Sequence, residues 1–345
     1  MMSTPLVSIL IPVYNCAQYI EEAIKSVLEQ NYANLDILIC DDCSTDDSLM
    51  HIKRLAGTDA RIRVFTNEKN QGKVLTLSRL FKEAKGKYIA FLDADDYLEK
   101  YKIEKQVDYM EQYPEIGLCG CNYASVSENG KIVKVSNLPL SDQDIRKCVS
   151  VFPKEDFPFC CASVMILKEV YNEIGGYRDF FIRCCIGEDI DWILRIMDQF
   201  KVGNIDIIGY YYRFNPNSLT RKVYFSIQDR HIHDVIIFLA KQRIIYGTDC
   251  LENQNEEEYR EFIRKLSLPY LKDKSLYYKR ILIEFSINKD RKNAFMYFKR
   301  YAKINGCKIS TFKIFSMMII LLFIKYSILL TIKKKFKISH LSSRV

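Results

Sequence analysis

The strongest constraint on the fold is a regular alternation of apolar runs with helical patterns along the first part of the chain. Runs typical of strands begin 26 to 28 residues apart, near Val7, Leu35, Arg61, Tyr88 and Ile116. Between the first two runs, apolar residues recur at helical spacing at Ile20, Ala23, Ile24, Val27 and Leu28. Strands and helices in alternation build a parallel sheet covered by helices. The sequence therefore predicts an α/β fold, in which ligands bind at the carboxyl ends of the strands.

Composition excludes several classes of protein. A hydrophobic content of 48% excludes general disorder, and a net charge of +8 without an early basic block argues against a nucleic-acid partner. The twelve cysteines include neighbours such as Cys160-Cys161 and Cys184-Cys185, an arrangement with poor disulfide geometry. Neither a paired CxxC zinc framework nor a signal peptide is visible. We therefore expect a reduced cytoplasmic protein.

Polar residues follow the first and second predicted strands. The first strand ends with Pro12, Tyr14 and Asn15, and the second ends with Asp41 and Asp42. A carboxylate accepts hydrogen bonds from the ring N–H of a pyrimidine or from sugar hydroxyls, so two acids beside a tyrosine can hold a base and its ribose. The alternative is an ordinary turn with a half-buried aromatic ring and an acid that caps the next helix.

Three acids close the fourth predicted strand, at Asp93, Asp95 and Asp96. Like charges so close together repel, and a divalent cation would neutralise them. Mg²⁺ and Mn²⁺ bind carboxylate oxygens and keep positions open for phosphate. The pattern predicts a metal and diphosphate site at this strand end, with a solvated acidic turn as the alternative.

Two other groups of charged residues lie at the beginnings of helices. Lys73 and Arg79 belong to a helix whose positive N-terminus can face a diphosphate, although either side chain can also be an ordinary surface charge. Glu188, Asp189 and Asp191 begin a later helix. These acids either take part in chemistry or simply stabilise the positive end of that helix.

In their order, these motifs resemble those of the family 2 glycosyltransferases of the GT-A fold, enzymes common in bacterial capsule, lipopolysaccharide and O-antigen assembly. The resemblance covers about residues 5 to 220. Val7 to Asn15 looks like the opening strand of the family, and Asp41 to Asp46 like its nucleotide-binding turn. Asp93-Ala-Asp95-Asp96 looks like the DxD metal motif, and Glu188-Asp189 like the catalytic ED motif.

The resemblance implies a role for each group. Donor binding would involve Pro12, Tyr14, Asn15, Asp42, Lys73, Arg79, Asp93 and Asp95. Mn²⁺ or Mg²⁺ would be held by Asp95 and Asp96, and Asp189 would be the general base beside Glu188. Contacts to the acceptor or to the donor phosphates would come from Asp191, Trp192, Arg213 and Arg221.

The implied reaction is an inverting transfer from a nucleotide-diphosphate sugar, a UDP-sugar in the first place, to a hydroxyl of a saccharide or polyprenyl-linked acceptor. The alternative is a nucleotide-sugar-binding subunit of a polysaccharide assembly complex that has lost its chemistry. A dehydrogenase is disfavoured because no GxGxxG follows the first strand. Two positions depart from the family pattern: Cys43 replaces the usual glycine, which predicts altered backbone angles in the turn, and Leu80 replaces a common asparagine.

We expect a catalytic domain at residues 1–220, with a nucleotide-sugar half at about 1–125 and an acceptor half at about 126–220. A helical extension at 221–315 and an apolar, polybasic tail at 316–345 would follow. The apolar stretch is interrupted by Lys325 and is shorter than the roughly twenty largely uncharged residues of a transmembrane helix. Lysines follow it at 333, 334, 335 and 337. The pattern predicts an interfacial helix that holds the protein on the anionic inner face of the cytoplasmic membrane.

Overall fold

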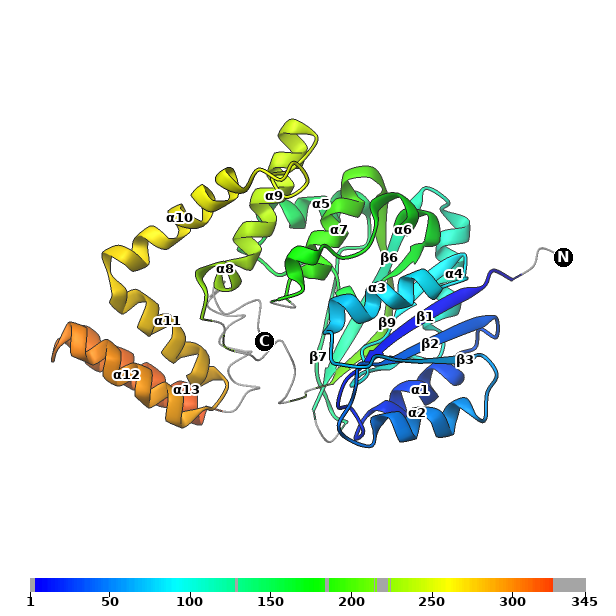
Figure 1. Ribbon diagram of the computed structural model, residues 1–345, viewed down its shortest axis with the longest axis horizontal. Helices are drawn as coiled ribbons and strands as arrows, with labels where there is room; N and C mark the ends of the chain where they lie inside the picture. Colours follow the sequence, from blue (N-terminus) through cyan, green and yellow to red (C-terminus); the bar gives the residue numbers. More distant parts are fainter. Residues whose placement is uncertain are drawn as a thin grey trace. The chain divides into compact units, whose positions relative to one another are not determined.

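The structure is a computed structural model, and it describes residues 4–127, 130–183, 186–213, 215, 223 and 225–324. The chain divides into two compact units, Met1–Asn215 and Pro216–Val345. The first unit consists of a sheet flanked by helices, and the second consists of helices (Figure 1).

In the described part of the chain, nine strands of the first unit form one sheet. Its order is β3-β2-β1-β4-β8-β6-β9-β5, and β7 pairs with β6. The strands are β1 (Val7–Val13), β2 (Leu35–Asp41), β3 (Ile62–Thr66), β4 (Tyr88–Phe91), β5 (Tyr97–Leu98), β6 (Ile116–Val126), β7 (Ile132–Val135), β8 (Met165–Leu167) and β9 (Lys201–Arg213).

The five predicted strands are confirmed as β1, β2, β3, β4 and β6, and the expected mostly parallel α/β fold is therefore confirmed. The sheet also contains β8, which lies antiparallel between β4 and β6. A three-residue strand is too short to show an alternating pattern, which is why the sequence did not reveal it. Because β8 comes from residues beyond 125, the two expected halves of the catalytic region share a single sheet.

Helices cover both faces of this sheet, and Figure 1 shows α1 and α2 on the side of β1 and β2 opposite to α3. The helices of the first unit are α1 (Ile20–Leu28), α2 (Ser48–Ala56), α3 (Lys73–Glu83), α4 (Lys102–Gln112), α5 (Asp142–Val151), α6 (Lys168–Ile174) and α7 (Glu188–Gln199), with short 3₁₀ turns η1 (Cys161–Ser163) and η2 (Asp179–Phe181).

The predicted apolar face of α1 is confirmed, because Ile20, Ile24 and Val27 are fully buried against β1 and β2. Each such side chain contributes about 1.5–3 kcal/mol through the apolar surface that it removes from water. On the other face, Phe81 of α3 packs edge-on against Phe91 of β4 at 5.5 Å between ring centroids. The sheet is thus buried on both sides, as a mainly parallel sheet requires.

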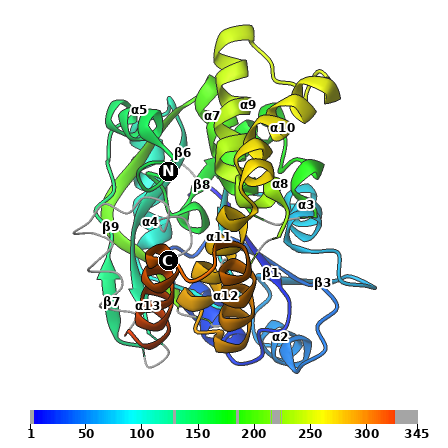
Figure 2. The same cartoon turned by 90° about the vertical axis from the view of Figure 1, so that its left-hand side faces the viewer.

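The second unit is built from α8 (Ile227–Arg230), α9 (Ile232–Tyr246), α10 (Glu256–Lys272), α11 (Lys274–Ile287), α12 (Arg291–Asn305) and α13 (Ile309–Phe323). Figure 2 shows α11, α12 and α13 packed together. Ile314, Met318 and Leu322 of α13 join the apolar core of this unit. The tail boundary expected between residues 315 and 316 is therefore wrong, because it would cut through α13.

None of the helices in the described ranges combines the length and the apolar composition needed to cross a membrane. The remainder of the expected tail, residues 325–345 with its lysine cluster, lies outside the described residues.

Gly86 provides a test of the sheet. A Cβ added there would lie 2.5 Å from the Ser8 nitrogen and 2.7 Å from the Leu6 oxygen, both backbone atoms that cannot move without disturbing β1. We predict that Gly86→Ala lowers the free energy of unfolding by about 1–3 kcal/mol or more, measured by urea denaturation. Gly57→Ala is the control, since its nearest neighbour would be 3.4 Å away. Equal stability of the two variants would contradict the packing described here.

Candidate active site

The turn after β2 is fastened to the end of β1. Asn15 accepts a hydrogen bond from the Thr45 nitrogen at 2.8 Å through Oδ1, and its own nitrogen donates to Ser44 Oγ at 3.0 Å. Asn15 and Cys43 both have left-handed backbones, with φ of 52° and 59°. This conformation costs a non-glycine residue roughly 1–2 kcal/mol. Cys43 thus keeps the backbone angle of a glycine position, although the sequence predicted that the turn would change.

Pro12 and Tyr14 lie where β1 leaves the sheet. Pairing between β1 and β4 ends at Leu10 and Phe91, so Pro12 lies beyond β4 and its missing N–H is not needed for that ladder. Tyr14 is exposed at the end of the strand. Both positions are compatible with contact to the donor. Asn15, in contrast, is hydrogen-bonded to the turn after β2 and holds that turn in place.

The two acids of the turn have different surroundings. The buried Asp42 accepts hydrogen bonds from Asn67 Nδ2 at 2.8 Å, from the Gln71 nitrogen at 2.9 Å and from the Gly72 nitrogen at 2.8 Å. Its carboxylate therefore holds the loop before α3, which differs from the expected contact with a nucleotide base. Asp41 is also buried, and its Oδ1 has no hydrogen-bond partner among the described residues. The spare acceptor of the pair thus belongs to Asp41.

Arg79 is a positioning residue in this structure. Its guanidinium donates to the Thr66 oxygen at 2.7 Å and to Asn67 Oδ1 at 2.8 Å, and it lies over the Phe65 ring. Asn67 in turn donates to Asp42. Arg79 therefore supports the turn from behind, whereas the sequence predicted a contact with the donor diphosphate.

The three acids after β4 also divide by environment. Asp93 Oδ1 pairs with Lys73 Nζ at 2.7 Å, and Asp95 Oδ2 accepts from Asn215 Nδ2 at 2.8 Å. Asp96 is buried and accepts from the Tyr210 hydroxyl at 2.8 Å and from the Arg213 nitrogen at 2.7 Å. Both Asp96 oxygens are thus committed to the fold, which argues against the expected metal ligation by Asp96.

Electrostatics show that this cluster is short of positive charge. Burial, followed by the charge of Asp93, raises the pKa of Asp95. Burial and the charges of Asp95 and Asp93 raise the pKa of Asp96 well above its usual value. Within the described ranges, no three His, Cys, Asp or Glu side chains gather closely enough to hold a metal ion by themselves. Mg²⁺ or Mn²⁺ commonly combines one or two carboxylates with substrate phosphates, and Asp93 and Asp95 fit that requirement.

Lys73 connects these acids to the start of α7. Burial opposes its charge, but Asp93 and Glu188 raise the pKa of Lys73 well above its usual value. Lys73 was expected to face a diphosphate, and here it already neutralises Asp93. The same ammonium lies near enough to Glu188 and Asp189 to offset part of the rise that burial causes in the pKa of each carboxyl. The two acidic motifs, 95 residues apart between Asp93 and Glu188, therefore meet around one lysine.

Burial raises the pKa of both acids at the start of α7. Gly187 precedes them with a left-handed φ of 77°. Burial and the charge of Asp189 raise the pKa of Glu188 to about 7, and Glu188 Oε2 has no hydrogen-bond partner in the described part of the chain. Burial also raises the pKa of Asp189, although Lys73, the Ile190 nitrogen and the Cys161 thiol stabilise its charged form. Raised carboxyl pKa values are a common property of catalytic groups.

Asp191 and Trp192, expected to contact the acceptor or the phosphates, both contact other parts of the fold. Asp191 is fully buried and pairs with Arg195 Nε at 3.0 Å. Trp192 is buried, donates to the Gly175 oxygen at 2.8 Å and packs against Phe81. Along α7, therefore, the acids of the first positions face the site, and the following residues form the core.

Arg213 is likewise part of the scaffold. Its guanidinium donates to the Asp95 oxygen at 3.0 Å and to Glu22 at 2.6 Å, and it lies between the rings of Tyr19 and Tyr97 at 5.2 Å from each. The expected contact of Arg213 with phosphate or acceptor is thus not what this geometry provides. Arg221 lies outside the described residues.

Sequence reasoning missed several residues that complete the site: Asn67, Cys161, Tyr210 and Asn215. Their contacts join segments far apart in the chain, such as Tyr210 with Asp96, across 114 residues. The run of three tyrosines at 210–212 is the sequence feature that could have indicated β9. For Cys161, the sequence shows only that it is next to Cys160.

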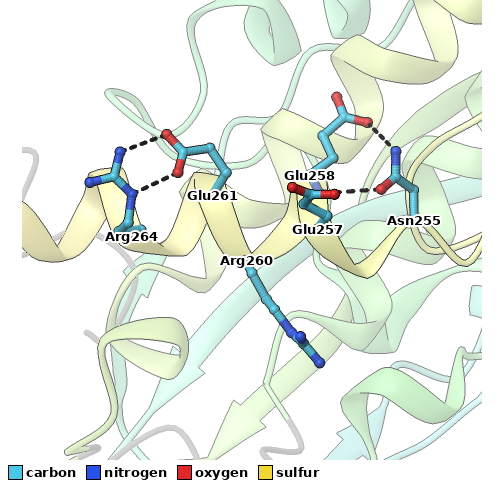
Figure 3. Close-up of a pocket in the computed structure, with 6 residues that line it drawn as sticks. All are labelled: Asn255, Glu257, Glu258, Arg260, Glu261 and Arg264. Atoms are coloured by element: carbon cyan, nitrogen blue, oxygen red, sulfur yellow. Dashed lines mark hydrogen bonds and ion pairs between the residues drawn. The ribbon is translucent and has the colours of Figure 1, made fainter.

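A separate hollow on α10 does not belong to this site. It is lined by Asn255, Glu257, Glu258, Arg260, Glu261 and Arg264 (Figure 3). Several of these charged side chains pair with one another, as in the 2.6 Å pair of Arg264 with Glu261. The hollow contains none of the motif residues.

Comparison with known protein families covers the region of the first three motifs, up to Asp96, and ends before Glu188 and Asp189. Residues 8–175 match the family described as "Glycosyl transferase family 2". An uncharacterized glycosyltransferase of Haemophilus influenzae is 37% identical over 134 residues, which cover 39% of this chain and 53% of that protein. The putative glycosyltransferase EpsE of Bacillus subtilis is 29% identical over 247 residues, which cover 71% of this chain and 84% of EpsE.

A third relative has a more specific name, the UDP-Glc:alpha-D-GlcNAc-diphosphoundecaprenol beta-1,3-glucosyltransferase WfaP of Escherichia coli. It is 44% identical over 106 residues, which cover 31% of this chain and 41% of WfaP. The chain thus spans about half of the Haemophilus protein and less of WfaP.

Solved structures agree on the fold. S. aureus TarS 1-349, in complex with UDP-GlcNAc, matches with a TM-score of 0.52 at 18% identity, covering 68% of this chain and 66% of that one. The mannosyltransferase PcManGT of Pyrobaculum calidifontis, in complex with GDP-Man and Mn2+, matches with a TM-score of 0.51 at 17% identity. The match covers 98% of this chain and 86% of PcManGT.

The carboxylate at position 188 gives a prediction that does not depend on activity. A carboxyl whose pKa is raised on folding destabilises the fold increasingly as pH rises, because the folded state holds its proton more tightly than the unfolded chain. We therefore predict that Glu188→Gln raises the melting temperature at pH 8, and that this gain shrinks as pH falls below 7. Thermal unfolding across pH checks it, and Glu169→Gln, at the exposed start of α6, is the control. A gain independent of pH would contradict the raised pKa.

The ordered motifs, the sheet and the matches converge on one identity: over residues 8–175 the chain is a member of glycosyl transferase family 2, with the GT-A fold.

Proposed function

We propose that this chain is an inverting glycosyltransferase that moves a sugar from a nucleotide-diphosphate donor to a hydroxyl of a saccharide or lipid-linked acceptor in bacterial surface polysaccharide synthesis. The observation that carries the proposal is the meeting of the DxD and ED acids around Lys73. The DxD side supplies negative charge for a cation and a diphosphate. The ED side supplies a carboxylate base.

Donor binding is assigned to the carboxyl edge of β1, β2 and β4. Tyr14 offers an exposed ring on which a base can stack, and Asp41 offers the spare acceptor for a base N–H or a ribose hydroxyl. TarS and WfaP, whose names include UDP-sugars, support a UDP-sugar, whereas PcManGT holds GDP-Man. The proposal is therefore a nucleotide-diphosphate sugar, with a UDP-sugar as the first candidate.

A divalent cation, Mn²⁺ or Mg²⁺, would be held by Asp95 together with Asp93. When bound, it would neutralise the diphosphate and favour its departure. The raised pKa values of Asp95 and Asp96 support this assignment, since burial and then the charges of neighbouring acids raise them, and a cation would oppose both effects. Asp96 would orient the motif through Tyr210 and Arg213.

Asp189 is proposed as the general base. Its carboxylate would take the proton of the acceptor hydroxyl while that oxygen attacks the anomeric carbon, and the bond to the nucleoside diphosphate would break with inversion. The Cys161 thiol and the Ile190 nitrogen hold the carboxylate in place. Glu188 lies beside it, and its unpartnered Oε2 is a candidate contact for the acceptor.

The acceptor and the place of action follow from the same comparison. WfaP is named for a diphosphoundecaprenol acceptor, which supports a lipid-linked acceptor for this chain too. Such an acceptor lies in the cytoplasmic membrane, while nucleotide sugars are cytoplasmic. We therefore propose that the protein works on the inner face of that membrane, as a peripheral protein held by an anionic surface.

One experiment tests the function against its alternative, a binding subunit without activity. Purified protein is incubated with UDP-, GDP- and dTDP-sugars, with and without Mn²⁺, and nucleotide release is measured beside donor binding by calorimetry. Metal-dependent release of one nucleotide supports the transferase, and NMR of a transferred product would give its anomeric configuration. Tight donor binding with no release from any donor would favour the binding subunit.

The metal assignment predicts different outcomes at neighbouring positions. Asp95→Asn should abolish Mn²⁺-dependent donor binding while leaving the melting temperature unchanged or higher, because it relieves repulsion within the acidic cluster. Asp96→Asn should instead lower the melting temperature, because it weakens the buried contacts with Tyr210 and Arg213. Calorimetry and thermal unfolding measure both effects. Normal Mn²⁺-dependent binding by Asp95→Asn would remove Asp95 from the metal site.

The base assignment predicts a loss of chemistry without a loss of binding. Asp189→Asn keeps the size of the side chain but removes its basicity, so transfer should fall by roughly 10²–10⁴, the usual contribution of a positioned base. Donor affinity should barely change. Single-turnover rates and calorimetry measure the two quantities, with Glu169→Gln as the control for losing an acid at a helix start. Transfer at the rate of the unaltered protein would exclude Asp189 as the base.

A further inference from the structure

Helix α13 has large apolar residues on two opposite faces, and its exposed residues also include Lys313 and Ser316. One face packs into the core of the second unit through Ile314, Met318 and Leu322. The opposite face carries Ile309, Phe312, Ile320 and Phe323, which are between 58% and 77% exposed. Large apolar side chains gathered on an exposed face often mark an interaction site, and this face therefore calls for a partner.

Helix α12 supplies positive charge beside that face. Its exposed residues include Arg291, Lys292, Lys299, Arg300 and Lys303. Lys308 and Lys313 are also exposed, and the sequence from 291 to 324 contains no Asp or Glu. A surface with this charge fits an anionic partner and repels a basic one.

The two helices form one hairpin, residues 291–323, in which the charged and apolar parts are neighbours. The Phe315 ring contacts Phe298 at 5.1 Å and Phe295 at 6.3 Å between centroids. The Arg291 guanidinium lies 4.8 Å from the centroid of the Phe323 ring. Figures 1 and 2 show α12 and α13 side by side. Arg291 therefore lies at the border of the exposed apolar face, on the helix that carries most of the other basic residues.

The end of α13 is fixed by a side chain. Lys289 Nζ donates to the Ile324 oxygen at 2.7 Å and to the Leu321 oxygen, so it caps carbonyls that a continuing helix would use. The helix has 15 residues and is therefore about 22 Å long. A hydrocarbon layer is about 30 Å thick. The geometry favours a helix that lies along a membrane surface over one that crosses it.

We propose that the α12–α13 hairpin docks on an anionic lipid bilayer. α13 lies in the plane of the interface with Ile309, Phe312, Ile320 and Phe323 among the headgroups and upper acyl chains, and the lysines and arginines contact lipid phosphates. This deepens the membrane association included in the proposed function. It places the docking surface on α12 and α13 and does not require residues 325–345.

The test uses the full-length protein and vesicle flotation. Vesicles of phosphatidylcholine with phosphatidylglycerol should bind the protein, and pure phosphatidylcholine should bind it more weakly. The double variant Phe312→Ser/Phe323→Ser should bind anionic vesicles at least about tenfold more weakly. It lacks the two aromatic rings whose transfer from water into the bilayer would stabilise the bound state. The double variant Lys299→Glu/Lys303→Glu should bind anionic vesicles at least about tenfold more weakly, and its binding to pure phosphatidylcholine should not change.

A matched control separates this surface from exposed apolar residues in general. Ile244→Ser/Leu271→Ser changes two residues that are 77% and 75% exposed in the same unit but outside the hairpin, and it should bind as the unaltered protein does. Melting temperatures should stay unchanged in all variants. If the Phe312/Phe323 variant floats normally, the hairpin is not the docking surface. If no vesicle binds but this variant dissociates a dimer in gel filtration, the face is a protein interface instead.

Vesicle binding needs no sugar donor, and donor hydrolysis needs no vesicle. Hydrolysis measured on the same variants without lipid should therefore remain normal, and loss of either property alone identifies which of the two proposals has failed.

Discussion

The ion pair between Lys73 and Asp93 is the interaction on which the site depends. It joins the first turn of α3 to the end of β4, and the same ammonium stabilises the carboxylates at the start of α7. One lysine cannot neutralise both acidic motifs. The remaining negative charge raises the pKa of Asp95, Asp96, Glu188 and Asp189 after burial has done the same. An acidic site of this kind is costly for the fold alone, and a bound cation would relieve the repulsion.

The neighbouring charges show how the fold supports that site. Asp191 and Arg195 form a buried pair on α7, and Arg213 is held between two tyrosine rings while its backbone nitrogen donates to Asp96. These groups are buried with partners, as charged groups in a protein interior usually are. Glu188 Oε2 and Asp41 Oδ1 have none among the described residues. Glu188 and Asp41 are thus two acids of the motifs that keep a spare oxygen in the described part of the chain.

The second unit presents a similar contrast in its apolar residues. Ile314 and Met318 of α13 are buried in the core, while Ile309 and Phe312, on the opposite face of the same helix, are exposed. Packing explains the first face, and an external partner is needed to explain the second. The basic side chains of α12 select an anionic surface as that partner.

The sequence by itself determined the parallel strands, the helices between them and the position of the acidic motifs, because apolar periodicity and strand ends are local features. It also placed Glu188 and Asp189 at the start of a helix, and its motifs indicated the family whose model matches residues 8–175. Tertiary structure alone decided which charged side chains remain for chemistry. Asp96, Asp191, Trp192, Arg79 and Arg213 appeared as candidate ligands, and each is used by the fold through contacts with distant segments. A hydrogen bond between residues 114 positions apart, such as Tyr210 with Asp96, has no local signature in the sequence, since it exists only when the sheet brings two strand ends together.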